Sequence, residues 1–190
     1  MQRGIVSVFG SSTPPPESAD YQLARALGRR LAEAGFVVMS GGYRGTMEAV
    51  SLGAKEAGGF TIGVTVDPFD RWGLKANPYI DVEIKFPTLF QRLHYLVTAG
   101  DALIALPGGI GTLSEMALAW SLLQTGELSL RPFLLLGSRW RRLLDVYLDP
   151  FYIREVDVGL LRVVETPEEA VEALQSYAWR TAEQSPRPMG

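Results

Sequence analysis

The sequence predicts an α/β protein built on a doubly wound parallel sheet of about six or seven strands, with helices on both faces. Short runs that are apolar throughout alternate along the chain with segments of helical periodicity. This alternation is typical of a parallel sheet that is covered on both sides. Several of the apolar runs lead directly into glycines. The 190 residues, 47% of them hydrophobic, are enough for one domain with a substantial core.

The first half of the chain supplies four strands and three helices. We expect strands at residues 5–12, 36–42, 59–66 and 81–86, and helices at 19–34, 46–58 and 88–99. In the first helix, leucines recur every four residues until Gly35 ends the pattern. Residues 67–80 contain two prolines and one glycine and predict a long irregular loop. Such a loop is either functional or a plain connection.

The second half continues the alternation. We expect strands at residues 101–105, 131–137 and 161–165, and helices at 116–124 and 140–149. A last helix should follow Thr166, a good N-cap residue, with Pro167 at its first position and Glu169 as a capping-box acid. Because composition does not shift along the chain, we expect one domain over residues 1–180 and a short tail over 181–190.

Composition excludes several classes of function. The net charge of −3 gives no electrostatic reason to expect nucleic-acid binding. The absence of cysteine excludes disulfides and thiolate metal sites and is compatible with a reducing cytoplasm. No apolar run approaches the length of a membrane span, and the N-terminal run is too short for a signal peptide. A single histidine, His94, makes no convincing metal site, and we expect it to be structural.

The stretch LPGGIGTLSE at residues 106–115 is the most informative motif. Its three glycines, Gly108, Gly109 and Gly111, lie between an expected strand and an expected helix. Glycines let a ligand approach the backbone, and a helix N-terminus offers unpaired N–H groups, so the turn suits a phosphate. Thr112 would cap the helix or donate its hydroxyl to the phosphate. The structural alternative is that the glycines only permit a tight turn. Neither a P-loop nor a GxGxxG fingerprint is present.

A second turn, SGGYRGTMEA at residues 40–49, is similar to PGGIGTLSEMA at 107–117, with one extra residue. Both turns follow strands, so they should lie at the same edge of the sheet. Glu115, about one helical turn beyond the glycines, would either complement the helix dipole or meet the sugar attached to a bound phosphate. Arg92 lies 23 residues before Glu115. It would be a surface residue by default, or else a positive partner for the acid.

These residues resemble the Lonely Guy (LOG) family, the cytokinin riboside 5′-monophosphate phosphoribohydrolases. Residues 107–115 match the PGGxGTxxE motif, and Arg92 matches the family's catalytic arginine, 15 residues before the motif proline. VSVFGSS at residues 6–12 resembles the first strand and loop of the family, and residues 40–59 resemble its second glycine-rich turn. The motif is less specific for the reaction than for the superfamily. Related members include molybdenum-cofactor carriers and proteins once labelled lysine decarboxylases.

The resemblance implies a Rossmann-like fold, a homodimer or higher homo-oligomer, no metal and no cofactor. It also implies hydrolysis of the N-glycosidic bond of a purine nucleoside 5′-monophosphate, N6-modified adenine included among the bases, to free base and ribose 5-phosphate. By match, Arg92 and Glu115 would be the catalytic pair. The residues that would bind the phosphate or nucleotide are Gly10, Ser11, Gly41, Gly42, Gly108, Gly109, Gly111 and Thr112. The alternative is a non-catalytic nucleotide or molybdenum-cofactor carrier that uses the same pocket.

Two runs depart from the family pattern. Phe90-Gln91-Arg92-Leu93 stands where members usually read His-Glu-Arg-Lys, a change that touches the base and sugar pocket. Gly45-Thr46-Met47-Glu48 stands where they read Gly-Leu-Met-Gly. Glu48 would contact the ribose or favour the start of its helix. No lysine lies beside a glycine-rich turn, which argues against a pyridoxal decarboxylase.

Two helices carry more apolar surface than one sheet should need. The helix over residues 112–124 has a broad stripe, and so does the one over residues 88–99. The stripe residues are Leu113, Met116, Ala117, Trp120 and Leu123 in the first, and Leu89, Phe90, Leu93 and Leu96 in the second. Their width predicts a homodimer or a tetramer.

Overall fold

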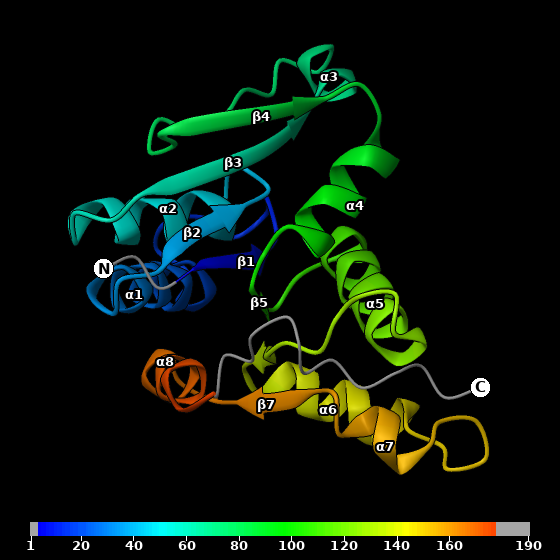
Figure 1. The fold of residues 1–190 in the computed structure, drawn as a ribbon. Helices are drawn as coiled ribbons and strands as arrows, with labels where there is room; N and C mark the ends of the chain where they lie inside the picture. Colours follow the sequence, from blue (N-terminus) through cyan, green and yellow to red (C-terminus); the bar gives the residue numbers. More distant parts are fainter. Residues whose placement is uncertain (1–3, 178–190) are drawn as a thin grey trace.

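The computed structural model describes residues 4–177 and confirms the predicted fold class. Seven strands form one all-parallel sheet in the order β4-β3-β2-β1-β5-β6-β7 (Figure 1). The strands are β1 (Ile5–Phe9), β2 (Val37–Ser40), β3 (Thr61–Val66), β4 (Val82–Phe86), β5 (Ala102–Ala105), β6 (Phe133–Leu136) and β7 (Arg162–Val164). The tail predicted over residues 181–190 lies outside the described residues.

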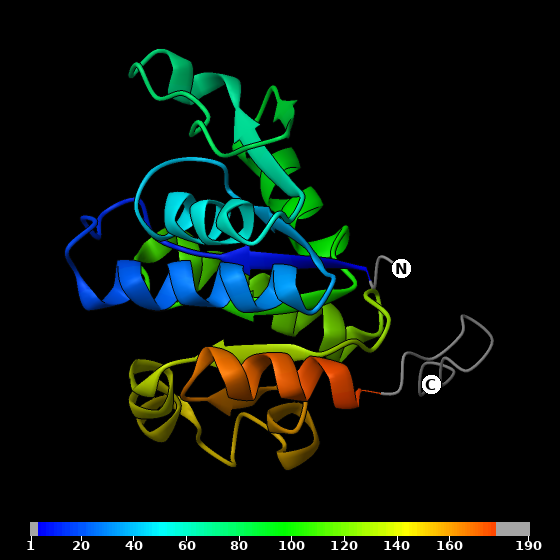
Figure 2. The same ribbon diagram turned by 90° about the vertical axis from the view of Figure 1, so that its left-hand side faces the viewer.

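Helices cover both faces of the sheet, as Figures 1 and 2 show. One face carries α1 (Ala19–Glu33), α2 (Thr46–Glu56) and α8 (Pro167–Ser176). The other carries α4 (Leu89–Thr98), α5 (Ile110–Thr125) and α6 (Ser138–Tyr147). Two short helices, α3 (Asp67–Asp70) and α7 (Glu155–Val158), lie in connections. The helices therefore form two layers with the sheet between them.

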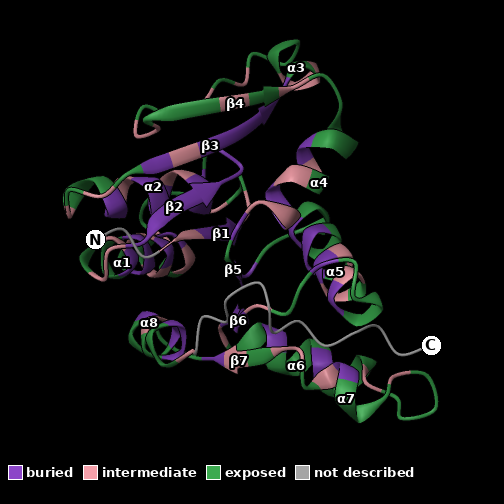
Figure 3. Ribbon diagram, in the orientation of Figure 1, coloured by how far each residue is buried: buried purple, intermediate pink, exposed green. Residues whose placement is uncertain are grey.

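The sheet divides the interior into two apolar cores. In β5, Ala102 and Ile104 pack against the α1 and α2 side, whereas Leu103 and Ala105 pack against the α4 and α5 side. Because both faces are covered, the central strands are apolar at nearly every position. Figure 3 shows these strands buried and β4 largely exposed at the edge.

The chain reverses direction across the sheet between β1 and β5. β1 pairs with β2 on one side and with β5 on the other, and both pairs are parallel. The connections after these two strands therefore run to opposite faces and leave a crevice at their carboxyl ends. Ligands of open α/β sheets bind at this switch point.

Several boundaries differ from the sequence prediction. Residues 67–80 are not irregular throughout, because α3 forms at their start with Pro68 in its first turn. The short helix α7 was not predicted, since four residues carry no periodicity. α5 begins at Ile110, earlier than expected, and ends at Thr125, followed by the C-cap residue Gly126, whose φ of 75° is the left-handed conformation that glycine adopts easily. The N-cap role of Thr166 is confirmed, because its side chain accepts the Glu169 N–H at 3.1 Å.

Candidate active site

A cavity of about 490 Å³ opens at the switch point, a size typical of small-molecule sites. The loop after β1, the loop after β2, the α3 segment after β3, the start of α4 and the first turns of α5 surround it. Its lining comprises Gly10, Ser11, Ser12, Thr13, Tyr43, Arg44, Met47, Phe69, Leu74, Leu89, Arg92, Gly109, Ile110, Gly111, Thr112 and Glu115. Seven of the ten residues that we predicted for the site thus lie around one cavity.

The N-terminus of α5 opens into this cavity. Gly109 is its N-cap residue, and a glycine has no side chain that could accept a hydrogen bond. The N–H groups of the first turn therefore have no side-chain cap. A Cβ atom at Gly109 or Gly111 would meet nothing within 4 Å, so ligand atoms have free access to this backbone. The turn has the geometry of an anion site.

Thr112 does not cap the helix, contrary to one of the two roles predicted for it. Its hydroxyl is buried and has no hydrogen-bond partner among residues 4–177. The Thr112 side chain can lie here only because residue 108 is a glycine, since a Cβ at Gly108 would collide with it. Gly108 itself does not line the cavity. A buried hydroxyl without a partner beside a helix N-terminus is a group that a bound ligand would satisfy.

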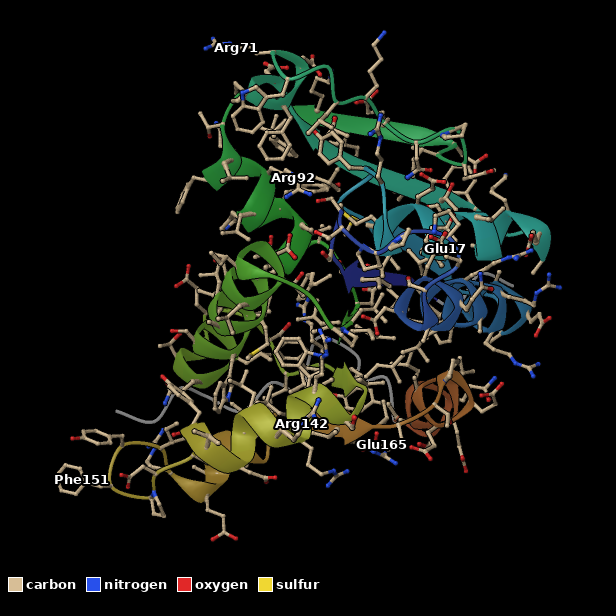
Figure 4. All side chains as sticks on the ribbon, turned by 180° about the vertical axis from the view of Figure 1, so that it is seen from behind. Glu17, Arg71, Arg92, Arg142, Phe151 and Glu165 are labelled. Carbon is tan, nitrogen blue, oxygen red and sulfur yellow. The ribbon has the colours of Figure 1, made fainter. Side chains whose placement is uncertain are left out.

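Arg92 is held rigidly on α4 with its guanidinium inside the protein. Its Nε donates to the carbonyl of Val64 at 2.7 Å, and its Nη2 donates to the carbonyl of Gly41 at 3.2 Å. Its guanidinium carbon lies 5.7 Å from the centre of the Tyr43 ring. Figure 4 shows Arg92 projecting from α4 toward the sheet. The default expectation of a surface arginine is therefore wrong.

Glu115 faces Arg92 from α5. Its Oε1 lies 3.6 Å from Nη1 of Arg92, and both side chains are only 7% exposed. Its Oε2 is buried and has no hydrogen-bond partner within residues 4–177. Burial raises the pKa of the Glu115 carboxyl to about 7, although the nearby Arg92 charge opposes that rise. Near neutral pH this carboxyl can therefore accept or release a proton.

The two predicted glycines after β2 do not line the cavity. A Cβ at Gly41 would collide with the guanidinium of Arg92, so this glycine makes room for a side chain and not for a ligand. Gly42 has a φ of 77°, and its carbonyl accepts two hydrogen bonds from Asn77. Gly41 thus makes room for Arg92 and Gly42 anchors Asn77, so both glycines support the residues around the cavity without lining it.

The loop after β1 is tied to the start of α2. The Ser11 N–H donates to Oγ1 of Thr46 at 2.8 Å, and the Ser11 carbonyl accepts the Thr46 N–H at 2.9 Å. These bonds hold Gly10 and Ser11 at the cavity wall. Glu48 does not line the cavity and accepts a hydrogen bond from the Tyr21 hydroxyl at 3.2 Å, which favours the helix-supporting role over contact with a ribose.

Sequence reasoning missed part of the lining. Tyr43, Arg44, Phe69 and Leu74 border the cavity but were not among the predicted site residues. The position of Tyr43 and Arg44 inside the second glycine-rich turn could have identified those two, and Phe69 and Leu74 lie in the 67–80 segment, for which a functional loop was one of the two alternatives. His94, expected to be structural, is exposed on α4.

Within residues 4–177, no group of three or more histidine, cysteine, aspartate and glutamate side chains is arranged to hold a metal ion. None of the helices in this part of the chain has the length and apolar character needed to cross a membrane.

The fold and site define an α/β protein of the Rossmann-like class, with a ligand-sized cavity at the switch point and glycine-rich turns beside it. Comparison with protein families agrees with this class. Residues 3–125 match the SLOG cluster4 family, and the chain belongs to that family.

Three relatives illustrate what the chain is similar to. An uncharacterized protein of Archaeoglobus fulgidus is 32% identical over 168 residues, which cover 87% of this chain and 91% of the relative. A cytokinin riboside 5′-monophosphate phosphoribohydrolase of Mycobacterium marinum is 34% identical over 121 residues, which cover 63% of each chain, less than two thirds of the relative's length. The solved structure of a molybdenum cofactor binding protein from Rippkaea orientalis superposes with a TM-score of 0.71 at 29% identity, covering 93% of this chain and 98% of that one.

Proposed function

We propose that this chain binds a purine nucleoside 5′-monophosphate in the switch-point cavity and hydrolyses its N-glycosidic bond. The products would be the free base and ribose 5-phosphate. The observation that carries the proposal is the buried Arg92–Glu115 pair, which lines the same cavity as the uncapped N-terminus of α5. The relatives named as phosphoribohydrolases support it.

The phosphate would bind at the first turn of α5. Backbone N–H groups of residues 110–112 would donate to its oxygens, and the buried Thr112 hydroxyl would gain the partner it lacks. The exposed Arg44 lines the same cavity and adds positive charge. Anchoring the phosphate uses binding energy remote from the reacting bond to place the sugar near Glu115.

Glu115 would act on the sugar. Breaking the glycosidic bond leaves a ribose with oxocarbenium character, which a nearby carboxylate stabilises. The same carboxylate would position a water molecule or accept its proton. In the overall reaction the water oxygen bonds to C1′ of the ribose, the C1′–N bond breaks with its electron pair going to the base nitrogen, and that nitrogen takes up a proton. A carboxyl whose pKa lies near 7 can accept the proton of the water and release it again, so that over the whole reaction one proton passes from the water to the base nitrogen.

Arg92 would act through Glu115. Two of its nitrogens are already bonded to backbone carbonyls, and Nη1 faces the carboxylate. We therefore assign Arg92 as a positioning residue that orients Glu115 and favours its ionised form. Because Arg92 also lines the cavity, it would be able to contact the substrate itself.

Incubation with a panel of nucleoside 5′-monophosphates tests the proposal. Chromatography should detect free base and ribose 5-phosphate for at least one purine nucleotide. Tight binding of a monophosphate without any cleavage would contradict the hydrolase.

That result would favour a second candidate, a carrier of a nucleotide or of a molybdenum cofactor. One observation supports this alternative. The molybdenum cofactor binding protein and a molybdenum cofactor carrier protein from Chlamydomonas reinhardtii both superpose over at least 92% of this chain. In a carrier, the glycine-rich turn would hold a phosphate group, and Glu115 would affect affinity alone.

A further inference from the structure

The segment after β3 contributes three aromatic and apolar side chains whose role the proposed reaction does not explain. Phe69 lies on α3, with its ring centre 5.3 Å from that of Tyr43 and 5.1 Å from that of Trp72. The Phe69 and Trp72 rings are stacked, with 25° between their planes. Leu74 follows in the same segment. We call Tyr43, Phe69, Trp72 and Leu74 the aromatic wall.

The aromatic wall borders the candidate active site. Tyr43, Phe69 and Leu74 line the same cavity as Thr112 and Glu115. The wall is also connected to the reactive pair, because the guanidinium of Arg92 lies against the Tyr43 ring. The cavity therefore has a polar part, at the start of α5, and an apolar part, along α3 and the residues after it.

Hydrogen bonds hold the wall in place. The Tyr43 hydroxyl donates to the Val66 carbonyl at 3.3 Å and accepts the Val66 N–H at 2.9 Å. At the far end of the segment, the Asn77 side chain donates to the carbonyls of Gly42 and Tyr43, each at 3.0 Å. The Leu74 N–H donates to the Phe69 carbonyl at 3.1 Å. A segment anchored at both ends gives a preformed surface, which lowers the entropic cost of binding a rigid ring.

We propose that Phe69, with Leu74 beside it, forms the subsite for the planar ring of the bound nucleotide. This inference rests on the proposed function, because it places the ring relative to a phosphate at the start of α5. Phe69 is half-buried and lines the cavity, so part of its surface is available to a ligand. Every nucleobase presents a flat π-face, and stacking on an aromatic side chain is a common way to bind one. Phe69 would then determine affinity for the base and not for the sugar phosphate.

Calorimetry with two ligands tests this separation. AMP carries the ring, and ribose 5-phosphate does not. Because the active protein should cleave AMP during a titration, affinities are compared in the Glu115→Gln background, where adding Phe69→Ala should weaken AMP binding about tenfold or more and leave ribose 5-phosphate binding unchanged. Phe69→Tyr, which keeps the ring, should retain AMP affinity. Phe60→Ala removes a phenylalanine that is 45% exposed and lies outside the cavity, and it should change neither ligand.

Two results would overturn the inference. If Phe69→Ala bound AMP with unchanged affinity, Phe69 would not be part of the subsite for the base. An equal loss of AMP and ribose 5-phosphate would show that Phe69 only supports the local fold. Failure of the proposed function would look different from both. A protein that binds AMP but never releases adenine would not be a hydrolase and could still use Phe69 to bind the ring, whereas an unaltered protein that binds neither ligand would overturn the inference as well.

Trp72 offers an independent signal. Since its ring stacks on Phe69, a base bound at the wall should change its fluorescence. The protein has four tryptophans, so the signal is assigned by difference with Trp72→Phe. AMP should alter the emission of the unaltered protein, ribose 5-phosphate should not, and Trp72→Phe should lose the AMP response. An identical AMP response in Trp72→Phe would contradict the subsite.

Discussion

Arg92 and Glu115 form a buried ion pair, and Oε2 of the acid has no hydrogen-bond partner within residues 4–177. Their Nη1 and Oε1 atoms lie 3.6 Å apart. Two other nitrogens of Arg92 donate hydrogen bonds to the carbonyls of Val64 and Gly41. The arginine is thus fixed by the fold, and the carboxyl remains available to a ligand.

The buried carboxyl should make stability depend on pH. The pKa of Glu115 is about 7 in the folded protein and 4.5 as its ordinary value. Between these values the folded state holds a proton that the unfolded state releases, so the free energy of unfolding falls as pH rises toward 7. Glu115→Gln cannot titrate. From pH 5 to pH 8 its stability relative to the unaltered protein should therefore rise by about 2–3 kcal/mol, at about 1.4 kcal/mol per pKa unit.

Urea unfolding of both proteins at pH 5 and pH 8 measures this difference. Comparing the two proteins at each pH cancels the titration of the groups that they share. A stability difference that does not change with pH would show that Glu115 titrates normally.

The rate of turnover should depend on the ionisation of the same Glu115 carboxyl. If the ionised carboxyl stabilises the ribose cation, kcat/KM for AMP should rise with pH and level off above a pKa of about 7. Initial rates of base release between pH 5 and pH 9 give the profile. A rate that falls across this range would mean that the protonated form is the active one.

Two neighbouring glycines should respond differently to substitution. In Gly109→Val, the new Cβ would lie in open space, but the side chain would block the approach of a ligand to the backbone at the start of α5. This variant should keep the fold and weaken AMP binding by tenfold or more, because each charge-assisted hydrogen bond contributes roughly 1.5–3 kcal/mol. Gly108→Ala should instead lower thermal stability, because the new Cβ collides with the Thr112 side chain.

Calorimetry and thermal unfolding of the two variants test these expectations. Adenosine serves as the ligand control, since it lacks the phosphate and should bind the unaltered protein far more weakly than AMP. Equal binding of adenosine and AMP would exclude a phosphate site at this turn.

We expect a homodimer or a higher homo-oligomer, because apolar side chains remain exposed along α4 and α5. Phe90 is 73% exposed, Ile110 86% and Leu113 43%, although Met116, Leu123 and Leu96 of the predicted stripes are buried in the chain's own core. Light scattering should give a mass at least twice 20.8 kDa, and Phe90→Glu combined with Leu113→Glu should reduce it. A monomer at micromolar concentration would contradict the prediction.

The sheet could be predicted from sequence because its strands are apolar on both faces and its helices are periodic. The pairing of Arg92 with Glu115 could not be derived from their spacing of 23 residues, because two helices separated by a strand can meet in many ways; only the family resemblance pointed to it.

The supporting residues were harder to predict. A glycine motif does not reveal whether the missing Cβ admits a ligand, as at Gly109, or a side chain, as at Gly41. Phe69 escaped notice because the four-residue helix that carries it is too short to show a period.

The central claim is that Glu115 carries out the chemistry, and chromatography of free base after incubation with AMP tests it most directly. The unaltered protein should release adenine, and Glu115→Gln should release it at least about a hundredfold more slowly while still binding AMP, because the variant keeps the shape of the side chain but loses its charge and its basic oxygen. Arg92→Ala, checked for folding by circular dichroism, should also lose turnover. Adenine release by Glu115→Gln at the rate of the unaltered protein would contradict the account.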